Sequence, residues 1–178
     1  MRFDTFAFRR RSVFRYPMDP PPRTAVLAAC FRQPRFRPNC PVRVFPRGWS
    51  EKVAAFQPEA IAAPREQLLG LAAIEKPPVF TRALIALENP GDPLLSAEER
   101  HRLWGVFRVP VFEQIVGPRG ELLAAECEAH DGLHIEAPEA HWDGYRLERA
   151  SCGCGRKTPR LTHFDPAERF RSAAAYAR

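Results

Sequence analysis

The alternation of apolar runs and amphipathic segments in the middle of the chain predicts an α/β fold. Residues 60–63 and 82–87 are short apolar runs without polar alternation, which is typical of strands covered on both faces of a sheet. Between them, residues 65–75 have apolar side chains at helical spacing, and prolines follow the segment. Residues 109–116 form another strand-like run, and a short helix is expected over residues 51–56. Strands that alternate with helices predict a small, mainly parallel sheet with flanking helices.

The clearest helix is predicted to begin at Ser96. The four residues from Ser96 to Glu99 form a capping box, in which the serine oxygen and the glutamate carboxylate accept hydrogen bonds from free N–H groups at the helix start. Leu103, Trp104 and Phe107 follow within the next turns, and we expect them to form the buried stripe of this helix.

The last third of the chain is predicted to be looser and to have shorter elements. A turn is expected at residues 117–120, where the sequence is Gly-Pro-Arg-Gly. Extended segments are expected over residues 121–127, 133–136 and 145–149. A helix over residues 165–178 is expected to close the chain.

The first 48 residues predict an arm rather than a domain. They contain eight of the nineteen prolines, and proline removes a backbone donor and fixes φ. We therefore expect residues 1–48 to form a basic, irregular or disordered arm, with a short helix or strand at residues 24–31. The α/β domain is then expected to cover residues 49–164.

Charge is distributed unevenly along the chain. The formal net charge is +6, but the first 50 residues alone carry +9, so the remainder carries −3. Arg9, Arg10, Arg11 and Arg15 alternate with aromatic residues near the N-terminus, a composition that suits phosphates and stacked bases. Nucleic acid is therefore one candidate partner, and a solvated arm without a partner is the alternative. The chain has no recognised nucleic-acid-binding motif.

The hydrophobic content predicts a water-soluble protein. Hydrophobic residues make up 45% of the chain, which is enough for a core, and the mean hydropathy is −0.36. No run of about eighteen apolar residues is present, so we expect no membrane-spanning helix and no membrane partner. The basic N-terminus is not followed by an apolar stretch of signal-peptide type. The expected location is the cytoplasm.

The use of cysteine points to a metal. The five cysteines are an odd number and, without a secretion signal, argue against a disulfide framework. Cys127, Cys152 and Cys154 lie in one C-terminal stretch, with His134 between the first two. Three thiolates and one imidazole are a common ligand set for a structural Zn²⁺, in which the protein fills all four tetrahedral positions. We therefore predict a structural zinc site formed by these four residues.

The sequence around the last two cysteines suits this chemistry. Residues 152–155 are Cys-Gly-Cys-Gly, and the glycines permit the backbone angles of a tight turn from which two thiolates converge. Arg156 and Lys157 follow, and their charge offsets the negative charge of three thiolates on one zinc ion.

Other residues near the site leave alternatives open. His130 and His141 are substitutes for His134, which we prefer because it lies within an apolar segment. Asp131 or Glu126 is a candidate acceptor for the second ring nitrogen of His134. The competing interpretation is a group of buried free thiols beside a core histidine.

Two segments that contain the predicted ligands resemble a known family. Residues 126–135 are Glu-Cys-Glu-Ala-His-Asp-Gly-Leu-His-Ile, and residues 152–160 are Cys-Gly-Cys-Gly-Arg-Lys-Thr-Pro-Arg. They are similar to the phenylacetate–CoA ligase family of AMP-forming enzymes, whose members have a Glu-Cys-Glu segment ending in Gly-Leu-His and then a Cys-x-Cys-Gly-Arg segment. The resemblance extends more weakly upstream, over about residues 56–160. It implies a metal in these segments, which some members hold there.

The chain departs from this family where the enzymes bind nucleotide. It has no Ser/Thr/Gly-rich loop of the kind whose backbone N–H groups hold the phosphates of ATP. Residues 88–92, Glu-Asn-Pro-Gly-Asp, replace the family's Gly-Gly-Glu, and residues 112–117 lack its Tyr-Gly-x-Thr-Glu motif. The Arg-x-x-Asp that holds ribose in the family is missing between His134 and Cys152.

These observations together predict a non-catalytic zinc-binding domain that is a truncated and degenerate relative of the ligases. Its expected role is binding or accessory, with an unidentified protein partner. Two alternatives stay open. One is an acyl-adenylate or acyl-CoA handling enzyme that needs a partner chain for its phosphate loop, with Glu113, Glu126 and Asp131 as the acids to test. The other is a nucleic-acid-binding protein that acts through the basic arm.

Overall fold

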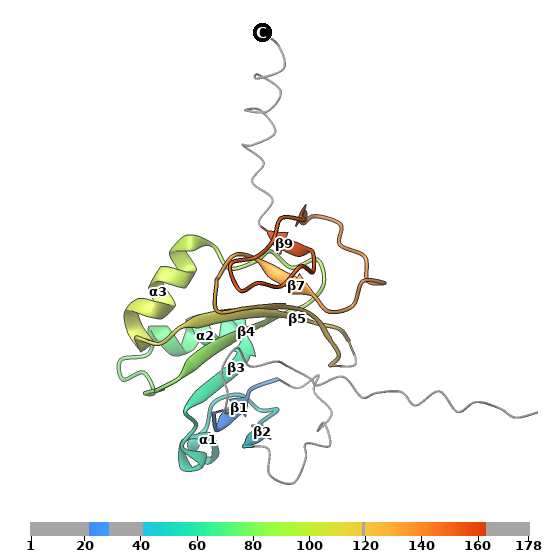
Figure 1. The fold of residues 1–178 in the computed structure, drawn as a ribbon. Coiled ribbons are helices and arrows are strands. Elements are labelled where there is room, and N and C mark those ends of the chain that lie inside the picture. The colour runs from blue at the N-terminus through green and yellow to red at the C-terminus, as the bar shows by residue number, and fades with distance from the viewer. Residues whose placement is uncertain (1–21, 29–40, 119, 163–178) are drawn as a thin grey trace, which may run out of the picture.

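A computed structural model describes residues 22–28, 41–118 and 120–162. Within these residues, three helices and nine strands are arranged around one sheet (Figure 1). The helices are α1 (Glu51–Phe56), α2 (Arg65–Ala73) and α3 (Ala97–Phe107). The strands are β1 (Thr24–Val26), β2 (Val42–Val44), β3 (Ala60–Pro64), β4 (Ala83–Glu88), β5 (Val111–Val116), β6 (Leu122–Glu126), β7 (Leu133–Ile135), β8 (Arg146–Glu148) and β9 (Arg160–Thr162).

The sheet is mixed, so the expectation of a mainly parallel sheet is wrong. Its order is β2-β1-β3-β4-β5-β6-β7-β9-β8, and the pairs up to β5 are parallel whereas those after β5 are antiparallel. The direction changes at the turn after β5, where the N–H of Gly120 donates to the carbonyl of Gly117 (2.8 Å). A connection this short joins antiparallel strands, because a parallel pair needs a crossover of about a dozen residues or more.

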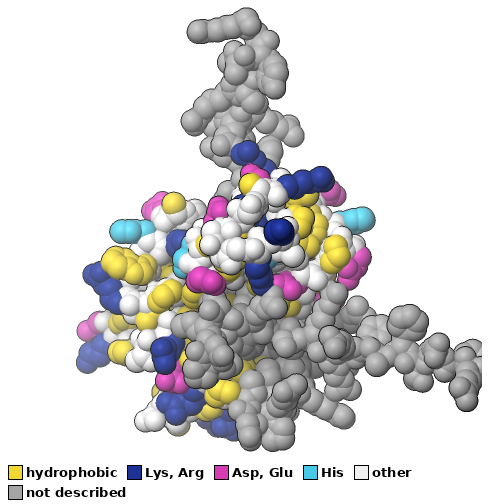
Figure 2. Space-filling view, in the orientation of Figure 1, with side chains coloured by type: hydrophobic (Ala, Val, Ile, Leu, Met, Phe, Trp, Pro, Cys, Tyr) yellow, Lys and Arg dark blue, Asp and Glu magenta, His cyan; other side chains and the backbone are white. Residues whose placement is uncertain are grey.

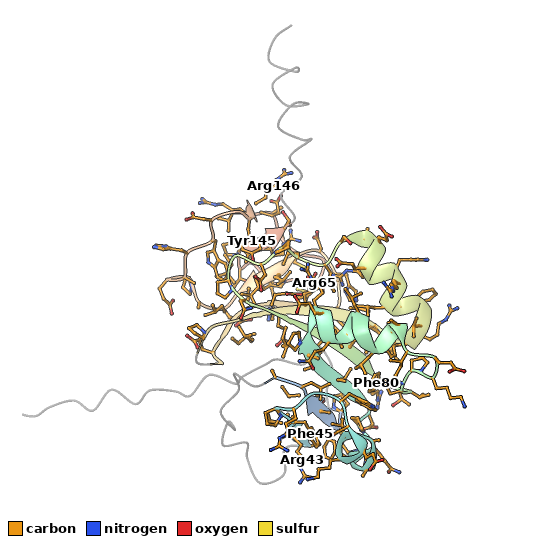
Figure 3. The ribbon with its side chains drawn as sticks, turned by 180° about the vertical axis from the view of Figure 1, so that it is seen from behind. Arg43, Phe45, Arg65, Phe80, Tyr145 and Arg146 are labelled. Atoms are coloured by element: carbon orange, nitrogen blue, oxygen red, sulfur yellow. The ribbon has the colours of Figure 1, made fainter. Side chains whose placement is uncertain are left out.

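Helices α2 and α3 cover one face of the parallel half of the sheet, as Figures 1 and 3 show from opposite sides. Strand β4 is buried along its whole length: Leu84 packs in the core on the helix side, and Ile85 packs in a cluster on the other face. Phe80 (Figure 3) packs against Trp49 and Phe107, with ring centroids 5.9 and 5.5 Å away. The strand predicted from its unbroken apolar run is therefore covered on both faces.

The sheet begins before residue 49. Strands β1 and β2 lie within the segment expected to be an arm, and β1 pairs in parallel with both β2 and β3. All three residues of β1 are buried, so part of this segment belongs to the α/β unit. The predicted helix over residues 165–178 lies outside the described residues, as do Arg9, Arg10, Arg11 and Arg15. None of the helices in the described ranges has the length and apolarity to span a bilayer.

Helix α3 begins as predicted, but its buried stripe is narrower than the predicted one. The Ser96 hydroxyl accepts from the N–H of Glu99 (3.2 Å), whose carboxylate accepts from the N–H of Ser96 (2.9 Å), so the capping box is confirmed. Leu103 and Phe107 are buried, whereas Trp104 is 47% exposed. Trp104 follows Leu103 by one position, about 100° around the helix, and that rotation turns it away from the core.

Candidate metal centre

The four predicted zinc ligands come together at the antiparallel end of the sheet. Cys127 directly follows β6, and His134 is the central residue of β7, paired with Ala125 of β6. Cys152 and Cys154 lie in the turn between β8 and β9. The β6–β7 pairing and the β7–β9 pairing bring these three segments side by side. Three of the four ligands are buried, and Cys154 is half-buried.

The ligand atoms lie close enough together to share one metal ion. The Sγ atoms of Cys127 and Cys152 are 3.5 Å apart, and Nε2 of His134 lies 3.4 Å from Sγ of Cys154. All four ligand atoms lie within 4.8 Å of one another. A tetrahedral ion with metal–sulfur and metal–nitrogen distances of about 2.3 and 2.0 Å separates its ligands by about 3.5–3.8 Å. The donor set and its spacing therefore fit a single metal ion.

The turn that presents Cys152 and Cys154 is closed by backbone hydrogen bonds. The N–H of Gly155 donates to the carbonyl of Cys152 (2.9 Å), and the N–H of Cys152 donates to the carbonyl of Arg156 (3.3 Å). Gly155 has a φ of +81°, in the left-handed region that glycine enters without steric cost. The turn thus directs two sulfur atoms from positions only two residues apart toward one point.

The ring of His134 is oriented by Thr158. Nδ1 of His134 lies 2.7 Å from Oγ1 of Thr158, and its Nε2 faces Cys154. When Nε2 binds a metal, Nδ1 carries the proton and donates a hydrogen bond to the Thr158 hydroxyl, and this bond fixes the tautomer. The acceptor expected from the sequence was Asp131 or Glu126, and the structure places Thr158 there instead.

Replacing Thr158 by valine is expected to weaken metal binding about 10- to 100-fold, because the imidazole loses the partner that fixes its tautomer and orientation. Valine has nearly the same shape but no hydroxyl. Competition with a chromogenic chelator measures the affinity. Thr158→Ser, which keeps the hydroxyl, is the matched control and is expected to bind like the parent. Equal affinities of Thr158→Val and the parent would show that the hydrogen bond has no part in the site.

The surroundings shift the pKa values of three of the ligands, and the direction differs among them. Burial raises the pKa of the Cys127 thiol to about 12, and the neighbouring sulfur atoms add to the effect. Burial also lowers the pKa of His134, with a further contribution from the Arg156 guanidinium, so the neutral imidazole that binds metals is favoured. The backbone N–H of Arg156 lowers the pKa of Cys154. A divalent cation among the sulfur atoms favours thiolates, so metal binding is expected to release protons.

The other histidines and acids near the site have partners of their own. Nδ1 of His130 lies 2.9 Å from Oε1 of Glu126, and the His130 ring stacks on Phe112 with centroids 4.7 Å apart. Asp131 pairs with the buried guanidinium of Arg160. His141 is exposed and is not part of the ligand group. Of the three histidines considered from the sequence, only His134 joins the three cysteines.

A buried ionic network links α3 to the segment that precedes Cys127. Arg100 of α3 pairs with the carboxylates of Glu113 in β5 and Glu126 in β6, and it also donates to the carbonyl of Val111 (2.7 Å). The Glu126 carboxylate accepts from the backbone N–H of Glu113 (2.9 Å). Glu113 is 1% exposed and Glu126 5%. This network was not predicted from the sequence, because its members share no short-range spacing.

Glu88, at the end of β4, is a buried carboxyl group on the helix side of the sheet. It is 4% exposed, and its Oε1 atom has no hydrogen-bond partner within the described structure. Burial raises the pKa of this carboxyl to about 8, although Arg65 at the start of α2 opposes the effect. Arg65 and Tyr145 lie on this side (Figure 3), where the Tyr145 hydroxyl donates to the carbonyl of Asp92 (2.6 Å).

Stability is expected to fall between about pH 4.5 and pH 8 because of Glu88. The unfolded chain releases this proton near pH 4.5, whereas the folded protein holds it to about pH 8, so raising the pH favours unfolding. The shift corresponds to a few kcal/mol, at about 1.4 kcal/mol per pKa unit. Glu88→Gln is expected to flatten this pH dependence in chemical denaturation at pH 6 and 9. The control is Glu98→Gln, at an exposed position of α3. If the pH dependence of stability is unchanged in Glu88→Gln, the assignment to Glu88 is wrong.

Two comparisons, one with protein-family models and one with curated proteins, bear on the origin of the chain. No protein-family model matches it, and no curated protein matches it either. The resemblance to the phenylacetate–CoA ligase family therefore rests on the residues quoted above.

Proposed function

We propose that this chain is a non-catalytic zinc-binding domain in which Cys127, His134, Cys152 and Cys154 hold one structural Zn²⁺. The observation that carries the proposal is the convergence of three sulfur atoms and one imidazole nitrogen within 4.8 Å. Sulfur and imidazole donors in a tetrahedral set favour zinc over magnesium, calcium or manganese, which prefer oxygen. Four protein ligands leave no open position for water or substrate, which distinguishes a structural from a catalytic zinc site.

The proposed role of the ion is to hold together the short strands of the antiparallel end. Strands β7, β8 and β9 have three residues each, and such short strands contribute little stability without a further crosslink. The ion connects the end of β6, the centre of β7 and the turn before β9. Zinc binding contributes an apparent 10–16 kcal/mol or so in small zinc-dependent domains, so it can supply much of the folding energy of this end.

Beyond the ion, we propose a binding or accessory role for a cytoplasmic relative of the phenylacetate–CoA ligases. The resemblance of the two ligand segments supports the relationship, and the missing phosphate loop argues against ligation by this chain alone. Two of the acids considered for an enzyme, Glu113 and Glu126, are engaged with Arg100. On the face in Figure 2, described basic and acidic side chains are interspersed, so the proposal of nucleic-acid binding rests on the arm outside the described residues.

Removal and return of metal tests this function. A chelator added to the full chain is expected to lower the melting temperature and to abolish amide-exchange protection in β6, β7 and β9, while β3 and β4 keep theirs. Zinc is expected to restore both properties, and magnesium is the matched control that should not. A melting temperature and exchange pattern that do not change with the chelator would overturn the proposal.

A further inference from the structure

The three sulfur atoms of the metal centre differ in their access to solvent. Cys127 and Cys152 are 5% and 4% exposed, whereas Cys154 is only half-buried. The residue that follows Cys154 is not packed against the rest of the fold, because a Cβ built on Gly155 would meet no atom within 4 Å. By contrast, a Cβ on Gly153 would lie 3.6 Å from Ala129. A small solute therefore reaches the sulfur of Cys154 before it reaches the other two.

The same geometry places a second sulfur within reach of Cys154. All the ligand atoms lie within 4.8 Å of one another, so the Cys127 and Cys154 sulfurs have to approach by only a few Å to reach the S–S bond length of about 2.05 Å. Cys152 is a poorer partner for Cys154, because one residue separates them in a turn closed by the bond from Gly155 to Cys152. A disulfide across a single residue in such a turn is strained.

We propose that Cys154 is a modification site for hydroperoxides, and that Cys127 converts the oxidised sulfur into a Cys127–Cys154 disulfide with release of the metal. This inference rests on the proposed zinc site, since it concerns the fate of the metal-bound sulfurs. The oxidant belongs to the class of hydrogen peroxide and organic hydroperoxides, small molecules that can reach a cysteine that is only half-buried.

The reaction has two balanced steps. The Cys154 thiolate attacks the terminal oxygen of the hydroperoxide, so that an S–O bond forms, the O–O bond breaks, and the rest of the peroxide takes a proton and leaves as water or an alcohol. The Cys127 thiolate then attacks the Cys154 sulfur; the S–S bond forms, the S–O bond breaks, and hydroxide takes a proton to leave as water. Two thiolates lose two electrons and the peroxide gains them, while the zinc keeps its charge.

The disulfide removes two of the four ligands at once. His134 and Cys152 alone do not complete a tetrahedral set, so the ion is released. The bond still ties the end of β6 to the turn before β9, and the centre can therefore be rebuilt by a thiol reductant and zinc.

The test uses the zinc-loaded full chain with Cys30→Ser and Cys40→Ser, so that only the three cluster cysteines react. Hydrogen peroxide is added, a chromogenic chelator follows zinc release, and alkylation followed by trypsin and mass spectrometry maps the thiols. Cys127 falls in the tryptic peptide of residues 120–146, whereas Cys152 and Cys154 share the peptide of residues 150–156, so fragment spectra of the linked peptides assign the bond. The expected result is release of about one zinc with loss of two thiols, and a crosslink from Cys127 to Cys154 that dithiothreitol and zinc reverse.

A matched variant, Cys154→His, keeps four zinc-binding side chains but lacks the accessible sulfur. Peroxide is expected to release zinc from this variant at least about tenfold more slowly than from the parent. Zinc that stays bound in peroxide, equal release rates in the two proteins, or a disulfide that omits Cys154 would overturn the inference while leaving the zinc site intact. If Cys154→His fails to hold zinc, the crosslinks mapped in the parent protein test the inference instead. A parent that never holds zinc would instead refute the proposed function.

Discussion

Replacing Cys152 by serine is expected to remove the metal and to unfold the antiparallel end of the sheet. Cys152 is 4% exposed and its sulfur lies 3.5 Å from that of Cys127, so a neutral hydroxyl on a shorter side chain leaves the ion with three ligands and an open position. Zinc content should fall from about one per chain to near zero, and amide-exchange protection in β7 and β9 should be lost.

The control for this variant is Cys30→Ser, which changes a cysteine outside the ligand group and should keep the metal. Elemental analysis gives the zinc content, and thermal unfolding gives the loss of stability, which we expect to be several kcal/mol. Full metal content and an unchanged melting temperature in Cys152→Ser would exclude this residue as a ligand.

Replacing Arg100 by methionine is expected to destabilise the fold by about 3–5 kcal/mol, which corresponds to a melting temperature about 10 °C lower. The guanidinium pairs with Glu113 and Glu126, which are 1% and 5% exposed. Its removal takes the guanidinium from two buried carboxylates, and a buried charge that loses its countercharge is costly in a low-dielectric interior, although His130 stays beside Glu126.

Arg102→Met is the matched control, since Arg102 lies on the same helix but is exposed; we expect its effect to stay within about 0.5 kcal/mol. Adding Glu113→Gln to Arg100→Met should recover part of the loss, because one of the uncompensated charges is removed. Chemical denaturation of the four proteins measures these differences. If Arg100→Met is tolerated as well as Arg102→Met, the network contributes nothing to stability.

The sequence predicted most helices and strands between residues 51 and 136, because apolar runs and helical spacing are local signals. It did not predict β2 or β9, which have three residues each and contain an arginine. It also missed the mixed sheet, since periodicity identifies a strand but not its direction. The Gly-Pro-Arg-Gly turn after β5 was the one available signal for an antiparallel hairpin.

The ligand group could be proposed from cysteine and histidine spacing, but its supporting contacts could not. Thr158 lies 24 residues after His134, and nothing in the sequence marks it as a partner. Glu126 was a reasonable acceptor from proximity, yet its carboxylate pairs with Arg100 and with His130. Which side chain a carboxylate meets depends on strand register and on the helix packed above it, and both are tertiary properties.

The most direct test of the proposed zinc centre is the metal content of the full chain, purified without a His tag and without added metal, together with a count of reactive thiols. A structural zinc centre requires about one zinc per chain, with three thiols protected until a chelator is added. A metal-free protein in which all five thiols react at once would contradict the zinc centre and everything derived from it.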